Sequence, residues 1–156
     1  MAYTSESARP RDFGLAWLLL CLAFLAHVID EAWSNFLSVY NPAVLALRLR
    51  NPWFPMPVFE FREWLIGLIA VNLFFLALTP FALRNSRWLR PLAYFFAAIH
   101  FLNGIGHTLG TMFGSPFPEV HFPHPVPGFY SSPLLIAASM YLFISLRRST
   151  LSRKTT

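Results

Sequence analysis

Charged residues are scarce in this chain of 156 residues, of which only 12% are Asp, Glu, Lys or Arg. Soluble domains carry roughly 25%. Hydrophobic residues make up 56% of the sequence, and its mean hydropathy is +0.50. This balance argues against a water-soluble domain, and the 17 Phe and 5 Trp residues suit a chain surrounded by lipid.

Several common functional motifs are missing. Cys21 is the single cysteine, which excludes a disulfide framework and a CxxC redox or zinc motif. The sequence has no GxSxG elbow and no phosphate-binding loop, because the glycines of "GIGHTLG" lie inside an apolar segment. The formal charge of +5 does not indicate nucleic-acid binding either, because the basic residues are sorted by loop.

Four long apolar segments fill most of the chain. A hydrocarbon core of ~30 Å needs about 20 helical residues at ~1.5 Å each, and helices are the only open-chain structures that span lipid. We therefore predict an all-α, integral membrane four-helix bundle as a single domain at 13–147, between a polar tail at 1–12 and a basic tail at 148–156. The apolar segments are Gly14–Ser38, Trp64–Leu83, Pro91–Phe113 and Phe129–Leu146.

Two details of the helix boundaries can also be predicted. The first helix should run from about Phe13 to Val39. A short interfacial helix should then start at Asn41 and Pro42, because Asn caps a helix and Pro suits its first turn. A signal peptide is the alternative for the first segment, but no small-x-small cleavage pattern follows it.

The basic residues predict the topology. Nine of the twelve Lys and Arg residues lie in the N-terminal tail, the segment 84–90 and the C-terminal tail, and the loop 114–127 has none. Four spans place these three basic segments on one side, so the positive-inside rule predicts that both termini are cytoplasmic. Arg48, Arg50 and Arg62 favour the opposite orientation. We expect a multi-pass protein of a bacterial-type plasma membrane, with the lipid bilayer as its partner.

Polar residues interrupt the apolar helices at one depth. In "LAFLAHVIDEAWSNF", His27, Asp30, Glu31 and Ser34 have offsets of 0, 3, 4 and 7, which fall on one helical face. A second stripe consists of His100, Asn103 and His107, and a third polar group consists of the carboxylates Glu60 and Glu63. A charge in lipid costs about 2.5–3.5 kcal/mol, so these groups should face inward and meet in the outer half of the bundle.

Imidazoles and carboxylates from facing helices are how bundles build zinc and di-iron sites. We therefore predict a divalent metal, zinc or iron, with His27, Glu31, His100 and His107 as ligands. Asp30, Glu63 and Asn103 are the candidate catalytic residues, with Asp30 or Glu63 as a further ligand or general base. Such a site predicts a metal-dependent membrane enzyme acting on a lipid or another apolar small molecule by hydrolysis or oxidation.

The sequence leaves three alternatives to a metal-dependent enzyme. His–carboxylate pairs can be a metal-free structural network that fixes helix packing. A metal-free isomerase or ligand-binding protein of the emopamil-binding type is a second alternative, by analogy of fold alone. An ion or proton carrier is the third, although the inner halves of the helices are nearly pure Leu, Phe and Ala and give no continuous polar path.

The motifs "HVIDE" (His27–Glu31), "HFLNGIGHTLGT" (His100–Thr111) and "PGFYSSPLL" (Pro127–Leu135) together resemble the HXXEE-domain family of small integral membrane proteins. The resemblance extends over about residues 14–146. Asp30 departs from the signature, because it stands where the family has its first Glu. The resemblance implies that His27, Glu31, Asn103 and His107 act together.

Overall fold

The structure, a computed structural model, describes residues 10–151. The described residues form helices and loops and no strand, so the predicted all-α class is confirmed for them. Most of the predicted tails, 1–12 and 148–156, lies outside this range. The helices are α1 Pro10–Trp33, α2 Leu37–Arg50, α3 Phe61–Ala77, α4 Thr79–Leu83, α5 Leu89–Phe113 and α6 Ser132–Leu151.

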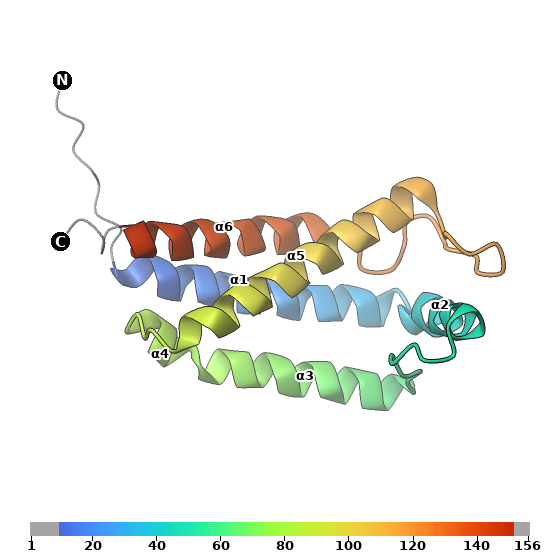
Figure 1. Ribbon diagram of the computed structural model, residues 1–156, viewed down its shortest axis with the longest axis horizontal. Coiled ribbons are helices and arrows are strands. Elements are labelled where there is room, and N and C mark those ends of the chain that lie inside the picture. The colour runs from blue at the N-terminus through green and yellow to red at the C-terminus, as the bar shows by residue number, and fades with distance from the viewer. Residues whose placement is uncertain (1–9, 152–156) are drawn as a thin grey trace, which may run out of the picture.

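The four longest helices, α1, α3, α5 and α6, run along the long axis of the molecule (Figure 1). Helix α1 is central, because it packs against α3, α4, α5 and α6. The first turn of α1 and the last turn of α6 lie at the same end, and α2 lies across the opposite end (Figure 1). This arrangement fits an even number of passes along the long axis.

Aromatic rings and two buried polar side chains join α1, α3 and α5 in the half of the molecule near the start of α1. The rings of Phe75 and Phe96 stack with centroids 3.9 Å apart. Trp17 donates its indole N–H to the carbonyl oxygen of Phe75 at 3.0 Å, and Asn72 donates to the carbonyl oxygen of Cys21 at 3.0 Å. Buried polar groups need such partners, so these bonds fix how α3 lies on α1.

The first helix ends earlier than predicted. Helix α1 stops at Trp33 instead of Val39, because Asn35 adopts a left-handed conformation with φ of 58°. The N–H of Phe36 then bonds to the carbonyl oxygen of Glu31 at 2.9 Å, a pattern that closes helix ends. Helix α2 begins at Leu37, and Pro42 lies inside it, so the predicted start at Asn41 and Pro42 is wrong.

The outer surface of the helices is apolar. Two segments, Asp12–Trp33 and Phe61–Leu83, are long and apolar enough to cross a membrane. In the most apolar window of the second segment, only 17% of the residues are buried. Ile66, Leu73 and Phe74 are 55–61% exposed there, so this segment is not a buried core helix, and an exposed apolar face of this kind marks a protein-interaction or membrane surface.

Candidate metal centre

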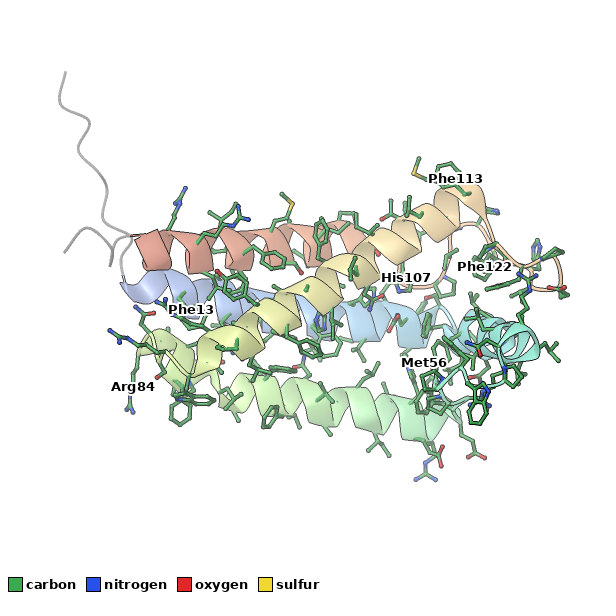
Figure 2. The ribbon with its side chains drawn as sticks, in the orientation of Figure 1. Phe13, Met56, Arg84, His107, Phe113 and Phe122 are labelled. Carbon is green, nitrogen blue, oxygen red and sulfur yellow. The ribbon has the colours of Figure 1, made fainter. Side chains whose placement is uncertain are left out.

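Three potential metal ligands converge between α1 and α5. One ligand atom from each of His27, Glu31 and His107 lies within 4.8 Å of the others, and all three residues are buried. The Oε1 atom of Glu31 is 3.1 Å from Nε2 of His107 and 3.4 Å from Nε2 of His27. Figure 2 shows His107 on the side of α5 toward α1, in the half of the molecule nearer α2. The cluster His27–Glu31–His107 is therefore the candidate metal centre.

The sequence spacing explains the α1 half of the cluster. His27 and Glu31 are four residues apart in a regular helix, so their side chains share one face a single turn apart. The imidazole rings of His27 and His107 meet edge to face, with centroids 4.8 Å apart. Each of the three residues is at most 6% exposed, so the cluster is shielded from solvent.

Gly128, in the loop before α6, closes the cluster on one side. A Cβ atom at this position would lie 2.8 Å from Cε1 of His107 and 3.0 Å from Cε1 of His27. Gly128 also has a φ of +87°, which other residues rarely adopt. Its carbonyl oxygen accepts a hydrogen bond from Ser132 at 2.7 Å. The backbone can approach both imidazoles only because residue 128 has no side chain.

A chain of polar contacts continues from His27 to the start of α6. Nδ1 of His27 lies 2.8 Å from Oγ of Ser131. Oδ2 of Asp30 accepts bonds of 2.8 Å from both the hydroxyl and the backbone N–H of Ser131. Asp30 is therefore turned toward Ser131 and contacts His27 only through that hydroxyl.

The other ring nitrogen of His27, Nε2, differs from Nδ1 in its hydrogen bonding. Nε2 is buried and has no hydrogen-bond partner among the described residues. It lies within ion-pair distance of Glu31 at 3.4 Å, but that contact does not meet hydrogen-bond geometry. Such unsatisfied buried atoms are rare and call for an explanation.

His100 lies outside the cluster. It is buried, and its Nδ1 donates to the carbonyl oxygen of Phe96 in its own helix at 2.8 Å, because that oxygen can only accept. Its ring packs edge-on against Phe24 and Phe96, with centroid distances of 4.3 and 4.4 Å. The geometry thus accounts for His100 as a hydrogen-bonded core histidine, and its predicted role as a ligand is not part of this arrangement.

The remaining predicted site residues are also outside the cluster. Glu63 is exposed in the first turn of α3, and Asn103 is half-buried on α5. Asp30 contacts His27 of the cluster only through the Ser131 hydroxyl. Catalytic roles for Asp30, Glu63 and Asn103 stay predictions.

Three neighbours of the cluster were missed in the sequence. Gly128 and Ser131 lie in an irregular loop that has no periodicity to indicate a direction. Phe36, whose ring centroid is 5.5 Å from that of His107, reaches the site through the left-handed turn at Asn35. Gly128 and Ser131 both lie in the motif "PGFYSSPLL", which is the one feature of the sequence that points to them.

An apolar cavity of about 400 Å³ lies between α1 and α3. Its volume falls in the range of small-molecule pockets, roughly 300–1,000 Å³. None of the cluster residues lines it, and its lining residues on α1 lie on roughly the opposite face of the helix from His27 and Glu31. Its lining is Leu25, Val28, Ile29, Ala32, Trp33, Leu65 and Ile69.

The described residues thus define an all-α protein with two segments apolar enough to span a membrane and a buried His–Glu–His cluster that could hold a metal ion. No family model matches the sequence, and no curated protein or solved structure matches it. The resemblance to the HXXEE-domain family stays a prediction.

Proposed function

We propose that this chain is an integral membrane protein with four spans and cytoplasmic termini that binds a divalent metal at His27, Glu31 and His107. We further propose that it is an enzyme that acts on a lipid or another apolar small molecule. The observation that carries the proposal is the convergence of three buried ligand atoms within 4.8 Å.

A metal accounts for an atom that a metal-free cluster leaves unsatisfied. Oε1 of Glu31 lies between two imidazole nitrogens, at 3.1 and 3.4 Å. The nearer nitrogen can donate a proton to it, but Nε2 of His27 has no hydrogen bond. A divalent cation would neutralise the buried carboxylate and accept the lone pairs of both imidazoles, and these are ligands that zinc and iron favour.

The donor set also favours catalysis over a purely structural site. Structural zinc sites are closed by four protein ligands, whereas catalytic zinc sites have three and keep one position open, as in the His₂Glu type. Two His and one carboxylate also suit non-haem iron. A metal bound there would supply a Lewis acid or, with iron, a redox centre. Glu31 and the two imidazoles would hold it in a space from which bulk water is excluded.

The surroundings support an apolar substrate. Phe36 lies against His107. The cavity between α1 and α3, on the other side of α1 from the cluster, is lined only by apolar residues. The exposed surface of α3 is apolar as well. A substrate that reaches this depth would come from the hydrocarbon phase, because a polar solute would lose its hydration there.

A metal-free isomerase or structural network is the second candidate, and one distance favours it. The 3.1 Å separation between Nε2 of His107 and Oε1 of Glu31 suits a direct charge-assisted hydrogen bond. In that case the cluster would hold α1 and α5 together, and a proton would take the place of the metal.

Elemental analysis separates the two candidates. The protein would be purified in detergent without chelator, next to Glu31→Gln and His107→Ala, with His121→Ala as the matched control because His121 is exposed in the loop. We expect about one zinc or iron per wild-type and control chain, and loss in both cluster variants. Metal-free wild type whose melting temperature does not respond to added zinc or iron would overturn the metal proposal.

A further inference from the structure

The Ser131 hydroxyl lies 2.8 Å from Nδ1 of His27, and the Asp30 carboxylate holds Ser131 in turn. We propose that they are a positioning pair that holds the His27 ring with its proton on Nδ1, so that the lone pair of Nε2 is directed at the metal position. As far as metal binding is concerned, this inference rests on the proposed function.

The Ser131 hydroxyl has a single proton to share among its neighbours. Oγ has three close neighbours: Oδ2 of Asp30 at 2.8 Å, the carbonyl oxygen of Gly128 at 3.2 Å, and Nδ1 of His27 at 2.8 Å. Ionised Asp30 and a backbone carbonyl can only accept. The 2.8 Å contact between Oγ and Oδ2 of ionised Asp30 needs a proton between the two oxygens, so the single hydroxyl proton goes to Oδ2. Oγ then accepts the proton of Nδ1.

The tautomer of His27 follows from this assignment. A neutral imidazole that carries its proton on Nδ1 has a free lone pair on Nε2. That atom is the one that has no hydrogen-bond partner and lies 3.4 Å from Oε1 of Glu31. Two lone pairs facing each other in a buried site repel, and a cation between them would remove the repulsion.

The opposite proton arrangement would make Ser131 a nucleophile. Ser131, His27 and Glu31 lie in the order of a Ser–His–carboxylate triad, with the hydroxyl donating to Nδ1 and Nε2–H donating to Glu31. The Asp30 carboxylate argues against this arrangement, because Oγ would then face Oδ2 at 2.8 Å without a proton between them. The backbone N–H of Ser131 also holds Oδ2 in place at 2.8 Å, so Asp30 cannot simply turn away.

The pair also ties the cluster to the packing of α1 and α6. Asp30 is on α1, and Ser131 directly precedes α6. The imidazole of His27 is held on one side by the Ser131 hydroxyl and on the other by the backbone of Gly128. Outer groups of this kind fix the orientation of a ligating imidazole, and losing one typically lowers metal affinity about 10–100-fold.

The first test needs neither a variant nor a metal. Nitrogen-15 NMR of metal-free wild-type protein reports which ring nitrogen of His27 carries the proton. We expect a protonated Nδ1 and an unprotonated Nε2. A proton on Nε2, or on both nitrogens, would overturn the inference. This result does not depend on metal binding, so it can hold even where elemental analysis rejects the proposed function.

The second test measures zinc affinity by titration. We expect Ser131→Ala and Asp30→Asn to weaken zinc binding about 10–100-fold, and Ser131→Thr, which keeps the hydroxyl, to restore most of it. Ser139→Ala is the matched control, because Ser139 is buried on α6 and its hydroxyl has no hydrogen-bond partner among the described residues. Unchanged affinity in Ser131→Ala, or an equal loss in Ser139→Ala, would contradict the inference.

Discussion

Nε2 of His107 lies 3.1 Å from Oε1 of Glu31, so a buried polar contact joins α5 to α1 close to the end of the molecule where α2 lies. Both side chains are at most 6% exposed. Breaking one partner of such a pair leaves the other buried and unpaired, which is costly in a low-dielectric interior. The contact is therefore either a hydrogen bond that holds two helices together or one edge of a metal site.

The two histidines of α5 provide a matched comparison. We expect His107→Ala to abolish metal binding, because it removes one of three ligands. His100→Ala should keep the metal content of wild type, because the His100 ring is bonded to the carbonyl oxygen of Phe96 and packs between Phe24 and Phe96. Metal analysis of both purified variants is the measurement. Equal loss in both would restore the four-ligand site expected from the sequence.

The polar part of α1 and the position of His107 could be predicted from the sequence. The four-residue spacing of His27 and Glu31 fixes a shared face in any regular helix, and the cost of charge in lipid turns that face inward. His100 shares a face with His107, but its ring bonds back to its own helix one turn away. Spacing gives the face of a helix and does not give the rotamer of the side chain.

The residues that the loop before α6 contributes to the site could not be predicted from the sequence, for a different physical reason. Gly128 and Ser131 reach the imidazoles through an irregular segment whose path depends on how α6 packs against α1. The left-handed Asn35 that ends α1 was missed as well, because the residues around it continue an apolar helical pattern without a glycine or proline. Both features are set by tertiary packing and backbone conformation, not by residue periodicity.

Gly128→Ala tests the close approach of the loop to the cluster. The new Cβ would be 2.8 Å from His107 and 3.0 Å from His27 at a φ of +87°, so we expect a destabilisation of about 1–3 kcal/mol from overpacking and weaker zinc binding. Gly67→Ala is the control, because a Cβ on that helical residue meets nothing within 4 Å. It should leave stability unchanged or raise it, since Ala favours helix. Melting temperatures of the two variants that do not differ would contradict the described loop position.

Two introduced cysteines test the topology. His121, in the loop after α5, and Arg87, just before α5, are both exposed, whereas the native Cys21 is fully buried and gives little background. In intact cells an impermeant thiol reagent should label His121→Cys and spare Arg87→Cys, because the positive-inside rule places the arginine-rich segment in the cytoplasm. Permeabilised cells should show labelling at both sites. The reverse pattern in intact cells would place the termini outside.

Leu73→Lys tests whether the apolar surface of α3 faces lipid. Leu73 lies in the middle of the segment Phe61–Leu83 and is 60% exposed. On a soluble protein an exposed substitution of this kind changes stability by only about 0.5 kcal/mol. In the centre of a membrane span a lysine costs about 2.5–3.5 kcal/mol, so we expect much less folded protein in the membrane fraction.

Leu49→Lys is the matched control, because Leu49 is 86% exposed on α2. Helix α2 lies across the end of the molecule and should be at the membrane surface. Equal tolerance of both lysines would contradict a lipid-facing α3, and with it the proposal that the cluster lies within a bilayer.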